Sequence, residues 1–176
     1  MKDLTPITPT NGFDVVLDIR YATKNNFTSE VIYDQPYALL HPKAAECLKK
    51  AIKLAADLRF HFKIFDSFRP YLAQEFLFKK FPGGVFVSDP KTGEIAHCRG
   101  IAVDLTLVDE AGNELDMGTG FDDFTPASNH GSKLISQIAQ KNRDILIDIM
   151  TKSGFEIYQP EWWHYQLPNV REYPVF

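Results

Sequence analysis

Cysteine is scarce in this sequence. Its 176 residues contain two cysteines, Cys47 and Cys98, and they stand far apart. Small secreted proteins that depend on disulfides carry more cysteines at closer spacing. The count therefore argues against a disulfide framework and favours a reducing compartment, and we expect a cytoplasmic protein.

Long hydrophobic runs are absent as well. No segment approaches the run of about 18 apolar residues from which a membrane-spanning helix is built. Met1–Pro6 also lacks the apolar centre of a signal peptide. We therefore expect no membrane span. A periplasmic location stays open if a signal peptide has been removed from a natural precursor.

Neither sign of charge dominates the composition. Lysine and arginine total 19 against 23 aspartate and glutamate residues, which gives a net charge of −4. Proteins that bind nucleic acid or anionic membranes usually present a basic excess. The composition therefore argues against both kinds of partner, and it leaves the oligomeric state open.

The order of apolar residues predicts one α+β domain over residues 1–176. Apolar residues at helical spacing, with Pro or Gly at the ends, indicate helices, and shorter alternating stretches are typical of strands. Helices are expected at Pro42–Leu58, Tyr71–Lys80 and Ser132–Ser153, and strands at Lys63–Phe65, Ile101–Val108, Phe155–Tyr158 and Trp163–Leu167. Elements mixed so irregularly favour a mostly antiparallel sheet flanked by helices on one side. A loop from Pro82 to Ala96 is expected at the rim of a cleft.

Four side chains of the kind that bind zinc stand in two short segments. His97 and Asp104 lie in the first, and Glu161 and His164 lie in the second. Two imidazoles and one carboxylate form a three-ligand shell with an open fourth position, which is typical of catalytic zinc. Zinc in such a shell lowers the pKa of a bound water to about 7. The remaining carboxylate, Glu161, is then the candidate base.

The first segment has the pattern of a strand. Apolar residues at Ile101 and Val103 alternate with Asp104, so the carboxylate lies on the face opposite the apolar one. Gly100 precedes this strand and allows the chain to bend. We therefore expect His97 to turn back toward the face that carries Asp104.

The second segment needs an irregularity. Glu161 and His164 are three residues apart and would lie on opposite faces of a regular strand. Pro160 fixes its own φ and has no N–H donor, as is typical of turns. We therefore expect a turn at Pro160 that opens into a strand beginning at Trp163.

Together the two segments resemble a known family. His97 to Asp104 matches His-x-x-Gly-x-Ala-x-Asp, and Glu161 to His164 matches Glu-x-Trp-His. The chain is similar to the zinc D,D-peptidases, and most of all to the D-alanyl-D-alanine dipeptidases of the vancomycin-resistance type. The similarity runs over nearly the whole chain, including Tyr21-Ala22-Thr23, Asp66-Ser67-Phe68-Arg69-Pro70, Met117-Gly118-Thr119-Gly120-Phe121-Asp122 and Ser153-Gly154-Phe155-Glu156.

The resemblance implies a fold, a reaction and a metal. The fold is the α+β fold of the zinc D,D-peptidases, which is also hedgehog-like. The reaction is hydrolysis of the D-alanyl-D-alanine dipeptide, a small-molecule substrate, with one Zn²⁺ per chain. Glu161 would be the general base, and the zinc ligands would be His97, Asp104 and His164.

The resemblance also assigns three residues to the substrate. Arg69 would stabilise the transition state, because a guanidinium that is always charged can face the oxyanion that develops there. Asp122 would bind the free ammonium group of the dipeptide. Tyr21 would take part in the same contact.

Two departures from the family pattern keep an alternative reaction open. Ile95 stands where members of the family carry serine, and the stretch from Arg69 to His97 is shorter than in the vancomycin-resistance enzymes. That stretch helps to roof the site. The alternative is a zinc D,D-carboxypeptidase that acts on longer peptidoglycan stem peptides.

A third reading is a non-catalytic zinc-binding module on the same scaffold. A purely structural zinc needs neither Glu161 nor Arg69, so their presence argues against it. Cys98 is expected to be a bystander, because adjacent side chains rarely share one ion. Caps or surface positions are expected for the other histidines, His41, His61 and His130.

Overall fold

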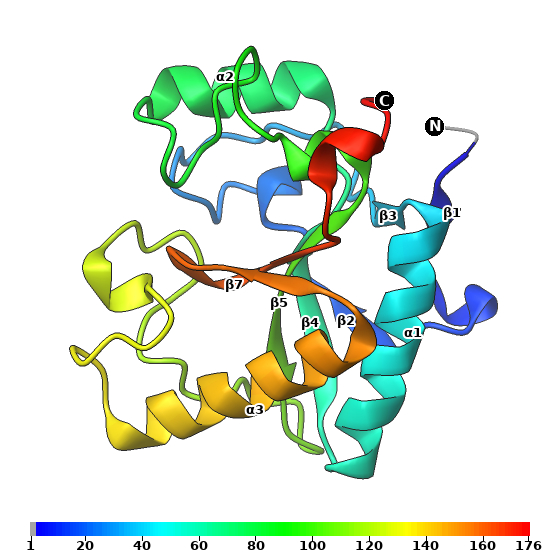
Figure 1. Ribbon diagram of the computed structural model, residues 1–176, viewed down its shortest axis with the longest axis vertical. Helices are drawn as coiled ribbons and strands as arrows, with labels where there is room; N and C mark the ends of the chain where they lie inside the picture. The colour runs from blue at the N-terminus through cyan, green and yellow to red at the C-terminus, as the bar shows by residue number, and fades with distance from the viewer. Residues whose placement is uncertain (1–2) are drawn as a thin grey trace.

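The computed structural model describes residues 3–176, and a five-stranded sheet runs through its centre (Figure 1). The strand order is β2-β4-β5-β7-β6, and all neighbours are antiparallel except β2 and β4. The strands of this sheet are β2 (Val15–Leu17), β4 (His61–Asp66), β5 (Ala102–Val108), β6 (Glu156–Tyr158) and β7 (Glu161–Gln166). A separate antiparallel pair joins β1 (Thr5–Pro6) to β3 (Leu39–Leu40). The predicted mostly antiparallel sheet is confirmed.

The central strand β5 is buried on both faces along its whole length. One face carries Val103, Leu105 and Leu107 into the hydrophobic core. The other carries Asp104, which is 2% exposed, so this side of the sheet is covered as well. The alternation in the sequence correctly predicted the strand and the side of it on which Asp104 lies.

Helices α1 (Pro42–Asp57) and α3 (Gln137–Ser153) pack against each other and contact the sheet. The start of α1 follows from its sequence: Pro42 occupies the first turn, and His41 Nδ1 accepts a hydrogen bond from the N–H of Lys43. The predicted helix at 42–58 and the predicted cap at His41 are confirmed.

Helix α3 begins later than the sequence pattern predicted. The expected start was Ser132, but the helix begins at Gln137, where the hydroxyl of Ser136 accepts a hydrogen bond from the N–H of Ala139. A serine N-cap satisfies an otherwise unpaired helical donor, and it competes with extending the helix backward. Gly154 ends the helix as expected, with a left-handed φ of 106°.

Helix α2 (Tyr71–Lys80) has its predicted bounds but lies apart from the α1–α3 pair (Figure 1). The expectation that all helices flank one side of the sheet was therefore wrong. The short 3-10 turns are η1 (Pro9–Asn11), η2 (Arg20–Ala22), η3 (Ala96–Arg99), η4 (Pro126–Ser128) and η5 (Val170–Glu172). Within the described residues, no helix combines the length and apolar character needed to cross a membrane.

Candidate active site

Two of the candidate ligands lie side by side on adjacent strands. Asp104 on β5 and His164 on β7 are paired residues in the antiparallel ladder. His97 comes from η3, which ends at Gly100 with a φ of 64°. A side chain at Gly100 would meet Leu4 at 2.8 Å, so glycine is needed both for the turn and for the space. The predicted bend at Gly100 is confirmed, and it brings His97 to the other two ligands.

The two imidazoles are oriented by bonds on their outer sides. His97 Nδ1 lies 2.6 Å from the carbonyl oxygen of Ser67, and His164 Nε2 lies 2.9 Å from Gln166 Oε1. The carbonyl oxygen of Ser67 only accepts, so Nδ1 of His97 carries a proton, and with the Gln166 amide oriented as in the structure Nε2 of His164 carries one too. The inner nitrogens, His97 Nε2 and His164 Nδ1, are then unprotonated and lie 3.1 Å apart.

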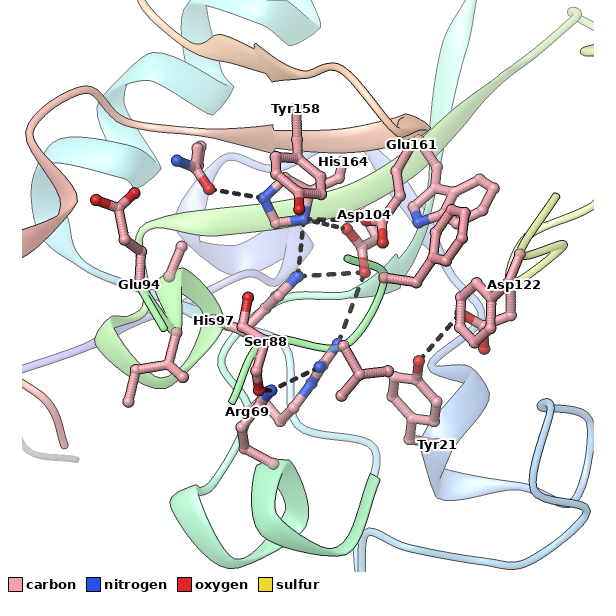
Figure 2. A pocket seen from close by; sticks show the side chains of 18 residues that line it. Tyr21, Arg69, Ser88, Glu94, His97, Asp104, Asp122, Tyr158, Glu161 and His164 are labelled. Carbon is pink, nitrogen blue, oxygen red and sulfur yellow. Dashed lines mark hydrogen bonds and ion pairs between the residues drawn. The ribbon is translucent and has the colours of Figure 1, made fainter. Parts of the chain in front are cut away.

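This arrangement suits a metal ion (Figure 2). Asp104 Oδ2 lies 3.3 Å from His97 Nε2 and Oδ1 lies 3.1 Å from His164 Nδ1, so acceptor atoms of three residues lie close together. Acceptors at such distances repel one another unless a cation lies between them. One atom from each of the three buried residues falls within 4.8 Å of the others, which makes the group able to hold a metal. Outer bonds to metal-binding imidazoles are typical of such sites.

The electrostatics of Asp104 agree with this role. Burial alone would raise its pKa, but positive charge beside the carboxylate, that of a protonated His97 above all, outweighs burial and holds the pKa of Asp104 well below its usual range. The carboxylate is therefore ionised and ready to bind a cation.

Glu161 and His164 both lie on β7, and an irregularity in the pairing of β7 with β6 brings Glu161 to the side of His164. Ile157 pairs with Tyr165, whereas the next residue, Tyr158, pairs with Glu161. Between these two pairs the chain advances by one residue in β6 and by four residues in β7. As a result the neighbours Trp163 and His164 both line the same pocket as Glu161. The predicted turn does precede Glu161, but the strand begins at Glu161 and not at Trp163.

Glu161 lies beside the ligand group without joining it. Its Oε2 is 3.8 Å from His164 Nδ1, and the residue is 5% exposed. Burial raises the pKa of Glu161 well above its usual range, and the negative charges of Asp104 and Asp122 add to the effect. A carboxylate with a raised pKa is a better proton acceptor, as a general base requires.

Arg69 follows β4 and points into the same pocket. Its Nε and Nη2 donate to Asp66 Oδ2 at 3.0 and 2.8 Å, and its Nη1 donates to Gln74 Oε1 at 2.9 Å. Nη2 also lies 3.9 Å from Asp104 Oδ2. Burial would lower the pKa of Arg69, but the charges around it, Asp66 first, outweigh burial and raise it. The guanidinium is therefore a fixed positive charge beside the ligand group.

Asp122 and Tyr21 lie next to each other on the pocket wall (Figure 2). The hydroxyl of Tyr21 donates to Asp122 Oδ1 at 3.1 Å, whereas Oδ2 is buried and has no hydrogen-bond partner in the described part of the chain. Burial raises the pKa of Asp122 to about 8. Its φ of 61° is unusual for a residue other than glycine. A strained carboxylate with a free oxygen in a pocket is suited to binding a cationic group.

Comparison with known proteins decides the family. A sequence model of the D-ala-D-ala dipeptidase family, Peptidase_M15, matches residues 10–174. The chain belongs to this family. It is 40% identical over 175 residues to the D-alanyl-D-alanine dipeptidase of Escherichia coli K12, covering 99% of this chain and 88% of that protein. It is 32% identical to the enzyme of the same name from Enterococcus faecium, with 85% of this chain and 84% of that protein covered, and 31% identical to the one from Streptomyces coelicolor over the same shares.

As a member of the dipeptidase family the chain is a peptidase, and its pocket brings together every residue to which the sequence resemblance gave a role. The pocket has a volume of about 90 Å³. The seven residues are Tyr21, Arg69, His97, Asp104, Asp122, Glu161 and His164. Cys98 is not among them: its thiol is fully buried, and burial raises its pKa to about 11.

Several pocket residues of this dipeptidase-family chain were missed from the sequence. Gln166 could have been found, because it lies two residues beyond His164 on one strand and therefore shares its face. Gln74 and Tyr158 gave no such signal, since only the fold brings them to the pocket. The loop from Pro82 to Ala96 does line the pocket as expected, through residues 86–88 and 94–96. His130 was expected at a cap or the surface but is 6% exposed, held by backbone bonds to Gln159.

Proposed function

We propose that this protein hydrolyses D-alanyl-D-alanine with one Zn²⁺ held by His97, Asp104 and His164. The observation that carries the proposal is the convergence of three acceptor atoms in a buried group, with Glu161 beside them and outside the group. Two imidazoles and one carboxylate are a ligand set of catalytic zinc. Zinc bound there would supply a Lewis acid that lowers the pKa of a water and polarises the amide carbonyl.

Glu161 would accept the proton of the attacking water. Its raised pKa and its place 3.8 Å from His164 Nδ1 support this role. The same carboxyl group can then donate the proton to the leaving amine, because the nitrogen must be protonated before the C–N bond breaks.

Arg69 would stabilise the oxyanion. Attack of water on the amide carbon moves negative charge to the carbonyl oxygen. Of the five guanidinium N–H groups of Arg69, three are used in the bonds to Asp66 and Gln74, which leaves two for that oxygen. Fixed donors at a developing charge are the most effective form of such stabilisation.

Asp122 would bind the free ammonium of the dipeptide, with Tyr21 as its support. Tyr21 occupies Oδ1, which leaves the buried Oδ2 to receive the substrate. A bound ammonium would also favour the ionised form of a carboxyl group whose pKa is about 8 in its absence.

The place of Asp122 in the pocket favours a dipeptide over a longer stem peptide. Phe86 stacks on Phe124 at the pocket wall with ring centroids 5.0 Å apart. If Asp122 binds the free ammonium, a longer peptide would instead place an uncharged amide against this buried carboxylate. We further propose a cytoplasmic location, which would suit the free thiols of Cys47 and Cys98.

The test is turnover of a small panel by zinc-reconstituted protein. The panel holds D,D-, L,D- and L,L-alanyl-alanine and a stem pentapeptide that ends in D-Ala-D-Ala. We expect turnover of the D,D-dipeptide and little of the others. Preferred cleavage of the pentapeptide would favour the carboxypeptidase alternative, and no turnover by zinc-loaded protein would favour a binding module.

A further inference from the structure

The loop at residues 81–95 roofs the pocket, and a few polar contacts from other elements hold it. The N–H of the Gln74 side chain donates to the carbonyl oxygen of Ser88 at 2.7 Å, and Tyr158 donates to the carbonyl oxygen of Val85 at 2.6 Å. A third contact, from Tyr71 to Pro90, is long at 3.4 Å. Tyr158 also pairs with Glu161 in the strand ladder and lies edge-on to the ring of His164, but Gln74 is the partner whose side chain hydrogen-bonds to Arg69.

Gln74 lies on α2 and is 2% exposed. Its Oε1 accepts a hydrogen bond from Arg69 Nη1 at 2.9 Å, while its Nε2 donates to Ser88. The orientation of the amide is unambiguous, because arginine only donates and a carbonyl oxygen only accepts. One planar group thus connects the roof loop to the guanidinium, and Figure 2 shows Arg69 and Ser88 on the same side of the pocket.

The two partners of Arg69 differ in how firmly they are fixed. Asp66 stands on β4, and its other oxygen accepts a hydrogen bond from Tyr33 at 2.9 Å. Gln74 is the partner whose position depends on the loop. If the loop moves away from Gln74, the amide loses one of its two bonds, and Arg69 loses a restraint on the angle of its guanidinium plane.

We propose that Gln74 is a positioning residue that couples closure of the loop at residues 81–95 to the orientation of Arg69. Arg69 then faces the oxyanion only while the loop is docked over the substrate, so turnover is linked to a closed pocket. The inference rests on the role given to Arg69 under the proposed function, and it adds the residue that orients Arg69 for that role.

Two variants at position 74 separate the two bonds. Gln74→Glu retains an acceptor for Arg69, but its ionised carboxylate cannot donate to Ser88. Gln74→Met keeps a similar volume and loses both bonds. Leu77→Val, also buried on α2, is the control, because it weakens packing without removing a polar contact.

Each variant is loaded with zinc and measured for kcat and KM on D-Ala-D-Ala, and for hydrogen–deuterium exchange of the peptide that covers residues 85–95. We expect faster exchange of this peptide in both position-74 variants and a kcat reduced about tenfold or more, with KM changed by less than about threefold. The loss should be larger for Gln74→Met. Leu77→Val should keep the wild-type kcat.

Three results would overturn the inference. Unchanged exchange in Gln74→Glu would mean that the amide does not hold the loop. Faster exchange with a wild-type kcat would mean that loop and arginine are independent. A raised KM with unchanged kcat would place the effect on substrate binding. Arg69→Ala measured in parallel separates the two proposals: if that variant keeps full turnover, the role of Arg69 itself is wrong.

Discussion

The candidate metal ligands and the carboxylate of Asp122 face the same pocket, but different kinds of backbone carry them. Asp104 and His164 are paired residues of two adjacent strands, and the turn that carries His97 is held by a glycine with little space around it. Asp122 stands in a loop with a left-handed φ. A metal shell tolerates little displacement, so rigid strands suit it. A substrate subsite on a loop can vary without disturbing the metal.

The loop of Asp122 is supported from a distance by Arg143 of α3. This buried guanidinium donates to the carbonyl oxygens of Met117, Ala127 and Asn129 at 2.7, 3.0 and 3.0 Å, which brackets the loop on both sides of Asp122. Burial lowers the pKa of Arg143 to about 10. The proposed chemistry would thus depend on the pairing of β5 with β7, whereas the proposed substrate contact would depend on side-chain bonds from α3 to the loop of Asp122.

The largest effect is expected for Glu161, which lies on strand β7. Glu161→Ala should reduce kcat/KM by about 10²–10⁴, because the attacking water loses its base. Zinc content and the far-ultraviolet circular dichroism spectrum should stay at wild-type values. Glu94→Ala, at the more exposed rim of the same pocket, is the control and should stay near wild type. Loss of zinc together with activity would make Glu161 a ligand and not the base.

Arg69→Ala is expected to lower kcat by about 10²–10³, the range for one lost oxyanion donor. The loss should be equal for D-Ala-D-Ala and for its N-acetyl derivative, since Arg69 acts at the carbonyl oxygen and not at the ammonium. Steady-state kinetics on both substrates measure this. A loss confined to the free dipeptide would move Arg69 to the ammonium subsite.

A smaller effect, selective for substrates with a free ammonium group, is expected for Asp122. An ammonium–carboxylate contact is worth about 1.5–3 kcal/mol, or about 10- to 150-fold in kcat/KM. The kcat/KM of the wild type should therefore be about 10- to 150-fold higher for D-Ala-D-Ala than for N-acetyl-D-Ala-D-Ala. This ratio should be smaller in Asp122→Asn. Equal rates of the wild type on both substrates would contradict the ammonium subsite and favour longer peptides.

The last effect concerns stability and not turnover. Burial raises the pKa of Asp122 to about 8 in the folded state, above its value of about 3.9 in the unfolded chain. Between these values the folded state binds the extra proton, so this residue makes the metal-free protein less stable as the pH rises from about 4 to 8. Asp122→Asn removes the titration. Its melting temperature should exceed that of the wild type by a margin that grows over this range, and a constant margin would contradict the shift.

The difference between strand and loop also explains what the sequence could predict. Asp104 was placed correctly because strand alternation is a local property, and Gly100 marked the bend before it. The irregularity in β7 was predicted as a turn, because a strand pattern alone does not show where the partner strand skips residues. The start of α3 was missed because Ser132 and Ser136 are both acceptable N-caps.

The residues missed in the pocket share one property. Gln74 on α2 and Tyr158 on β6 reach the pocket only once these elements have folded around it. No spacing rule connects them to the motifs. The strands β1, β2 and β3 span two or three residues each, too short for any periodic signal.

The central claim is that Zn²⁺ lies between His97, Asp104 and His164, and the most direct test is zinc analysis combined with zinc-edge X-ray absorption. The wild type should hold one zinc per chain, with nitrogen and oxygen neighbours at about 2.0–2.2 Å and no sulfur at about 2.3 Å. His164→Ala should lose the metal. Undiminished stoichiometric zinc in that variant, or a sulfur neighbour in the wild type that would implicate Cys98, would contradict the account.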